Sequence, residues 1–134
     1  MTGVAWAFAL LAEAVHVLVF VAEAILIDRP AVHQGIFLVP TSDVPAIRLW
    51  AFGVGFYNLS LALGLVAGVI AWASGYETVG RTLIVYICLF MLLGGAVVLL
   101  VADRLAMGRP RGKGIGGVLG QGIPPLGALI ALAL

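Results

Sequence analysis

Four apolar segments, each long enough to cross a lipid bilayer, constrain this chain more than any other feature. They run from about residue 4 to 27, 47 to 73, 82 to 101 and 116 to 134. A helix needs about 20 apolar residues to cross the hydrocarbon core. Only 10% of the residues are charged, against about a quarter in soluble domains. The sequence therefore predicts an all-α, polytopic membrane protein, in which residues 1–134 form a single four-helix transmembrane bundle.

The third and fourth segments differ in their interiors. Gly122, Pro124 and Pro125 interrupt the fourth, which makes it the weakest of the four. A proline inside a helix removes a backbone hydrogen bond, but neighbouring helices can compensate within a membrane bundle. The third segment has no polar side chain deep within it, so we expect it to serve as scaffold.

The basic residues predict how the bundle lies in the membrane. Segments 28–46 and 102–115, together with the flanking Arg48, hold six of the seven Lys and Arg residues. Because cytoplasmic loops are enriched in basic residues, we expect both segments to be cytoplasmic and both termini to lie outside. The protein would then be a multi-pass protein of the cell's inner (plasma) membrane. The net charge of +1 gives no reason to expect a nucleic-acid partner.

Three ionisable residues lie inside the first apolar segment: Glu13, His16 and Glu23. Such a group costs about 2–3 kcal/mol or more at membrane depth unless it has a partner. His16 and Glu23 are seven residues apart and therefore share one helix face. That face must point into the bundle, because the side that faces lipid is apolar. Glu13 lies about 60–80° around the helix from this face, one turn nearer the outer side.

Asn58 and Gln121 add polar groups on the second and fourth segments. A rise of about 1.5 Å per residue from the inner boundary gives each group a depth in the membrane. Glu23 lies about 6 Å deep, Gln121 about 8–10 Å, Asn58 about 12 Å and His16 about 16 Å. The predicted site is therefore an inward-facing cavity with four polar side chains and a tyrosine at its edge: Glu23, His16, Asn58, Gln121 and Tyr57.

Each of these residues also has a simpler explanation. An Asn or Gln between membrane helices commonly holds the helices together, a contact worth about 0.6–2 kcal/mol; this applies to Asn58 and Gln121. Glu23 alternatively reaches the inner interface or pairs with Arg29 or Arg48. His16 is too deep and its side chain too short for that.

Small residues recur at every fourth position in the second and fourth segments. They are Ser60, Gly64 and Gly68 in the second, and Gly116 and Gly120 in the fourth. This spacing lets helix backbones approach closely. The partner helix belongs either to the same chain or to a second copy in a homo-oligomer, and membrane lipid surrounds the remaining faces.

Three motifs follow one another along the chain. They are His16-x6-Glu23, the Gly55-Phe56-Tyr57-Asn58 block with Ala62 and Gly64, and Gln121 ahead of Pro124-Pro125. This pattern resembles that of the "domain of unknown function 1304" family of small bacterial integral membrane proteins, over nearly the whole chain. The family pattern has Asn-Gln just before the block, where this chain has Gly53 and Val54. The resemblance implies the architecture and the polar set, and it implies no reaction.

The pocket predicts an acid–base enzyme of the isomerase or cyclase type that acts on a lipophilic small molecule. Glu23 or Glu13 would be the general acid, and His16 would tune or orient it. The groups that bind or polarise a substrate oxygen would be Asn58, Tyr57 and Gln121. A carboxylic acid kept neutral by an apolar site can protonate an alkene, epoxide or enol. No cofactor is expected, since the chain contains no cofactor-binding motif.

Two other functions stay open. An oligomeric subunit that carries protons, cations or small molecules would also use intramembrane Glu and His, although four helices rarely enclose a pathway alone. A structural membrane protein would use none of these groups for chemistry. No metal is expected: Glu13-x-x-His16 has the spacing of half a carboxylate-bridged site, but Glu23 lies about 10 Å further along the axis from His16.

Overall fold

The structure is a computed structural model that describes residues 2–134, and it contains no strand over that range. Four helical stretches, Thr2–Ile25, Thr41–Ala73, Glu77–Arg104 and Ile115–Ala133, are long and apolar enough to cross a membrane. The prediction of an all-α membrane bundle with four spans is therefore confirmed.

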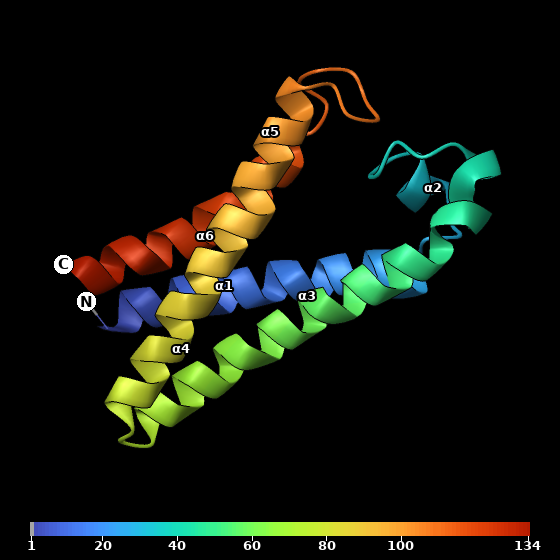
Figure 1. Ribbon diagram of the computed structural model, residues 1–134. Coiled ribbons are helices and arrows are strands. Elements are labelled where there is room, and N and C mark those ends of the chain that lie inside the picture. Colours follow the sequence, from blue (N-terminus) through green and yellow to red (C-terminus); the bar gives the residue numbers. More distant parts are fainter. Residues whose placement is uncertain (1) are drawn as a thin grey trace.

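These stretches and their connections contain α-helices together with short π-helical and 3-10 turns (Figure 1). In chain order they are α1 (Thr2–Phe20), the π-helical η1 (Val21–Ile25), α2 (Pro30–His33), the 3-10 turn η2 (Thr41–Asp43), α3 (Val44–Ala73), α4 (Glu77–Phe90), the π-helical η3 (Met91–Val97), α5 (Val98–Arg104) and α6 (Ile115–Ala133). Helix α1 continues directly into η1, and α4, η3 and α5 form one continuous stretch.

Helices α3 and α4 both begin earlier than the apolar segments predicted. Pro45 occupies the first turn of α3, where the N–H group it lacks would have no partner within the helix. Glu77 lies in the first turn of α4, where the positive end of the helix dipole favours its carboxylate. Hydrophobicity alone does not detect such helix starts, because the residues that favour them are not apolar.

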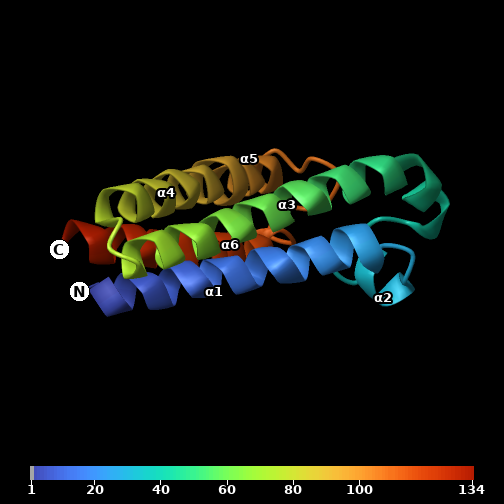
Figure 2. The ribbon, with the colours of Figure 1, turned by 90° about the horizontal axis from the view of Figure 1, so that it is seen from below.

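The ends of the bundle carry different connections. The start of α1, the end of α6 and the turn between α3 and α4 lie at one end, whereas α2 and residues 105–114 lie toward the other (Figure 1 and Figure 2). Helix α1 packs against α3 and α6, α3 packs against α4, and η3 packs against α6. The two basic segments thus share one end. That this end is cytoplasmic stays a prediction from the basic residues.

The bundle is packed most closely toward the end that carries the termini. Gly80 allows α4 to touch α3, since a Cβ there would lie 2.6 Å from the backbone nitrogen of Trp72. A Cβ at Gly64 or Gly68 would likewise meet a side chain of α4. The buried core of this half consists of Ala9, Ala12, Leu65, Ile84, Ile87, Cys88, Met91 and Ala128. Toward the other end, α3 and α5 diverge (Figure 1).

The small residues of α6 behave differently from those of α3. A Cβ added at Gly116 or Gly120 would meet no atom within 4 Å, so this pair makes no helix contact within the described chain. Helix α6 approaches α1 at Gly127 instead, where a Cβ would lie 2.5 Å from Phe8. The divergence of the helices leaves the first half of α6 without a close neighbour at these two positions.

Pro124 and Pro125 lie inside α6 without ending it, and both are buried. Because proline has no N–H group, the carbonyls of Gly120 and Gln121 lose the donors that they would have four residues later. Two backbone carbonyls therefore lack the donor four residues later that a regular α-helix supplies, and one of them belongs to the predicted site residue Gln121.

Candidate functional site

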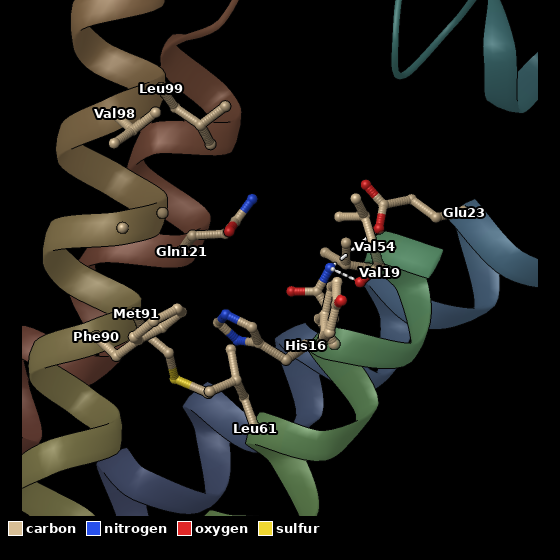
Figure 3. A pocket seen from close by; sticks show the side chains of 14 residues that line it. His16, Val19, Glu23, Val54, Leu61, Phe90, Met91, Val98, Leu99 and Gln121 are labelled. Carbon is tan, nitrogen blue, oxygen red and sulfur yellow. Dashed lines mark hydrogen bonds between the residues drawn. The ribbon is translucent and has the colours of Figure 1, made fainter. Parts of the chain in front are cut away.

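A cavity of about 330 Å³ opens where the helices diverge, bordered by α1 and η1, α3, η3 and α6. The four polar side chains predicted to share a pocket all line it: His16, Glu23, Asn58 and Gln121 (Figure 3). They come from three separate spans. The rest of the wall is mostly apolar, with Phe90 and Met91 below Gln121 on the side of the third span (Figure 3).

His16 is held in one orientation by its own helix. The residue is only 1% exposed, and its Nδ1 lies 2.9 Å from the carbonyl oxygen of Ala12, one turn earlier. A carbonyl can only accept, so Nδ1 carries the proton and Nε2 of the neutral ring keeps its lone pair. Among residues 2–134, no hydrogen-bond partner occupies Nε2. The ring extends toward the side of the cavity formed by Met91 and Gln121 (Figure 3).

Glu23 is held by an amide from the neighbouring helix. Nδ2 of Asn58 donates to Oε2 of Glu23 at 3.0 Å and to the carbonyl of Val54 at 3.1 Å (Figure 3). The contact depends on Gly55, because a Cβ there would lie only 2.9 Å from the Cβ of Ala24. One carboxyl oxygen is therefore fixed by α3, and Oε1 has no partner among the described residues.

The alternative ion pair for Glu23 does not form in this structure. Arg48 binds Asp28 instead, with 2.9 Å between guanidinium and carboxylate, and both side chains are more than half exposed. Glu23 therefore neither reaches the basic residues at the end of the bundle nor forms an ion pair within residues 2–134.

Two π-helical turns border the cavity from opposite sides. The turn η1 contains Glu23, and η3 contributes Gly94 and Gly95 to the wall. Such turns are rare and occur frequently at functional sites. Gly95 lets Gln121 lie directly against η3, since a Cβ there would lie 3.0 Å from Oε1 of the amide. The third span is thus a wall of the site as well as scaffold, a role that polar side chains alone did not indicate.

Tyr57 and Glu13 are less closely associated with the cavity. Tyr57 lines the cavity but its side chain is 74% exposed. Glu13 is half-buried, lines neither this cavity nor the groove beside it, and has no hydrogen-bond or ion-pair partner among residues 2–134. Of the three predicted acid–base residues, His16 and Glu23 share the cavity and Glu13 stands apart.

The two residues that precede the Gly55-Phe56-Tyr57-Asn58 block lie next to the site. Val54 lines the cavity and its carbonyl binds Asn58, so the side chain there is an apolar part of the wall. At Gly53, a Cβ would meet no atom within 4 Å. Of these two residues, only Val54 therefore forms part of the cavity wall.

The donor set suits proton transfer better than metal binding. Within residues 2–134, no three His, Cys, Asp or Glu side chains lie close enough together to hold a metal ion. The cavity instead combines a carboxyl group, an imidazole nitrogen and two amide side chains. These groups can donate, accept and orient protons at an otherwise apolar surface.

One protein family matches nearly the whole chain. The family described as "Protein of unknown function (DUF1304)" matches residues 10–133. The chain belongs to this family. Its matched range contains every polar residue of the cavity, and the predicted resemblance to this family is confirmed. No curated protein and no solved structure matches the chain.

Proposed function

We propose that this protein is an intramembrane acid–base enzyme, of the isomerase or cyclase type, that moves a proton on a lipophilic small molecule. The observation that carries the proposal is that His16 and Glu23 line one cavity, each with one side-chain atom that has no partner among residues 2–134. Ala12 holds one group and Asn58 holds the other, which leaves Nε2 and Oε1 for a ligand.

The two hydrogen bonds suggest the role of each group. Asn58 donates to Oε2 of Glu23, so the acidic proton resides on Oε1 and Glu23 acts as general acid. His16 acts as general base through Nε2, because Nδ1–H is engaged by the carbonyl of Ala12. This gives His16 a direct part in proton transfer, rather than the orienting role that its position in the sequence suggested.

An isomerisation by this pair balances without a cofactor. Nε2 of His16 removes a proton from a substrate carbon, and Oε1–H of Glu23 delivers one to a carbon or oxygen at the far end of a conjugated system. One C–H bond breaks, one C–H or O–H bond forms, and the electron pairs shift along the substrate. Between turnovers His16 releases its proton to water and Glu23 takes one up, so no oxidant or reductant is consumed.

The remaining wall supports a lipophilic substrate with a single polar function. The volume of about 330 Å³ lies at the lower end of the range for ligand sites, about 300–1,000 Å³. Apolar side chains such as Val19 and Leu61 form much of the surface. The amide nitrogen of Gln121 extends toward the interior (Figure 3), where it can donate to a substrate oxygen.

Deuterium incorporation from solvent tests the proposal and does not require the substrate to be identified first. The purified protein is placed in liposomes of total membrane-lipid extract in D₂O, and the lipophiles are analysed by high-resolution mass spectrometry. We expect one class of molecule to gain deuterium with time. His16→Gln and Glu23→Gln should each lower that rate by about 100- to 10,000-fold, whereas Ser60→Ala, which changes an exposed hydroxyl on α3, should not.

Two outcomes would contradict the proposal. One is the absence of any deuterium gain above liposomes without protein; the other is a wild-type rate in both site variants. A third outcome would indicate the carrier function instead. In it, the protein conducts protons across the same liposomes, His16→Gln abolishes this proton flux, and no lipophile gains deuterium.

A further inference from the structure

A second groove, of about 410 Å³, runs beside the cavity, between α1 with η1 and the first half of α6. Two basic residues of the loop 105–114, Arg109 and Lys113, line one part of it. Neither forms an ion pair with an acidic side chain among residues 2–134. Their positive charge is therefore available to an anion that lies in the groove.

Hydrogen bonds within the loop hold the segment that carries Lys113 in place. The buried carboxylate of Asp103 accepts hydrogen bonds from the backbone N–H groups of Gly112 and Gly114, at 2.8 and 2.7 Å. Lys113 lies between these two anchor points. Helix α6 begins at the residue after Gly114, so the positive end of its dipole reinforces the basic end of the groove. A phosphate group suits this combination of Arg, Lys and helix N-terminus.

The rest of the groove is shaped for hydrocarbon. On α6 its lining includes Gly117 and Gly120; a Cβ at Gly120 would meet no atom within 4 Å, so the helix leaves open space there. Leu18 of α1, with Ile36 and Phe37 from segment 28–46, supplies apolar surface. Apolar walls with a cationic end match a molecule that is charged at one end and hydrocarbon along the rest.

The groove also leads to the candidate site. Four residues line both spaces: Val19, Glu23, Leu99 and Gln121. Gln121 lies seven positions after Gly114 at the basic end, about 10 Å at 1.5 Å per residue. A molecule whose head lies at the basic end therefore needs a chain of roughly that length to reach the carboxyl and amide groups.

We propose that the groove binds a phosphate-headed amphiphile, with its head at Arg109 and Lys113 and its chain along α6 toward Glu23. The binding follows from the groove alone. The assignment of this amphiphile as the substrate rests on the proposed function, because it requires the acid–base pair to act on the chain that reaches it.

Lipid retention in native mass spectrometry tests the basic end. Purified protein is titrated with dioleoyl phosphatidylglycerol, and with dioleoyl phosphatidylcholine as the neutral counterpart of equal chain length. We expect preferential retention of phosphatidylglycerol. Arg109→Gln with Lys113→Gln should weaken it by about 25-fold, since each basic side chain near an anionic surface contributes roughly fivefold. The matched control, Arg104→Gln with Arg111→Gln, removes two charges at the same end outside the groove and should change retention by less than about threefold.

Filling the groove tests its apolar part. Gly120→Leu places a side chain in the groove, whereas Gly116→Leu adds the same side chain one turn earlier, outside it. Both positions have open space for a Cβ, so both variants are expected to fold. Retention of phosphatidylglycerol should be lost in Gly120→Leu and kept in Gly116→Leu.

Equal retention of the two lipids, or equal losses in the two double variants, would overturn the proposal. So would full displacement of phosphatidylglycerol by inorganic phosphate, which would indicate a simple anion site. The two assays separate the claims. Retained lipid without deuterium exchange contradicts only the proposed function, and exchange without selective retention contradicts only this inference.

Discussion

At the residue scale, the two intramembrane carboxyl groups of the first span differ in what surrounds them. Glu23 lines the cavity and the groove and receives a hydrogen bond from Asn58. Glu13 lies on the same helical stretch, half-buried, and lines neither space. Both residues are glutamates of the same span, but only Glu23 lines the cavity. Substituting each in turn therefore separates a role in proton transfer from the general effect of an acidic group within the span.

The first prediction concerns this pair of carboxyl groups. Glu23→Gln should lower deuterium incorporation by about 100-fold or more, because an amide cannot act as the acid. Glu13→Gln makes the same change outside the cavity and should retain incorporation. The measurement is the initial rate in liposomes at equal protein content. A larger loss in Glu13→Gln than in Glu23→Gln would show that the wrong carboxyl group has been assigned.

A second prediction concerns the contact that brings Asn58 to Glu23. Gly55→Ala places a Cβ 2.9 Å from the Cβ of Ala24 and should destabilise the protein by about 1–3 kcal/mol through overpacking. Gly53→Ala, two residues earlier on α3, meets no atom within 4 Å and should be neutral or gain up to about 1 kcal/mol from helix propensity. Thermal unfolding in detergent measures both. Equal unfolding temperatures for the two variants would contradict close contact at Gly55.

At the element scale, the sequence was sufficient to place polar residues at matching depths, because helical rise converts position directly into depth. His16, Glu23, Asn58 and Gln121 could therefore be grouped from their positions in the chain. The π-helical turns η1 and η3 could not be predicted, since they depend on how neighbouring helices pack rather than on polarity. The wall supplied by Gly94, Gly95 and Met91 was missed for the same reason: it contributes backbone shape and apolar surface.

The groove and the loop that borders it could not be predicted from the sequence either. The basic residues of segment 102–115 were evident, but only as an orientation signal. Their place at the end of a groove depends on the hydrogen bonds of Asp103 to Gly112 and Gly114, which join residues separated by a loop. No local pattern in the sequence specifies that pairing.

A third prediction belongs to this loop. Asp103→Ala removes the acceptor for both backbone N–H groups, so amide hydrogen exchange at Gly112 and Gly114 should become faster. Asp43→Ala removes another acidic residue, which is exposed and bound through its side chain only to the neighbouring Ser42, and should leave exchange in the loop unchanged. Hydrogen exchange read by mass spectrometry over residues 105–114 makes the comparison. Unchanged protection in Asp103→Ala would mean that the loop is held in another way.

At the scale of the whole molecule, the four spans bring the start of α1 and the end of α6 to one end and both basic segments to the other (Figure 2). The distribution of Lys and Arg predicts that the basic end is cytoplasmic. A reporter fused after Leu134 should therefore be active only if it functions outside the cytoplasm, and a reporter inserted near Arg111 should show the opposite behaviour. Cytoplasmic activity of the C-terminal fusion would show that the orientation is the opposite of the predicted one. It would not contradict the arrangement of the helices in the bundle.

The central claim is that His16 and Glu23 act as one unit on a molecule in the cavity. The most direct test is the rate of deuterium incorporation in His16→Gln, Glu23→Gln and the double variant. Residues that share a single proton-transfer step have strongly non-additive effects. We predict that each single variant is reduced nearly as far as the double variant. Single variants with small, independent losses that multiply in the double variant would contradict the account.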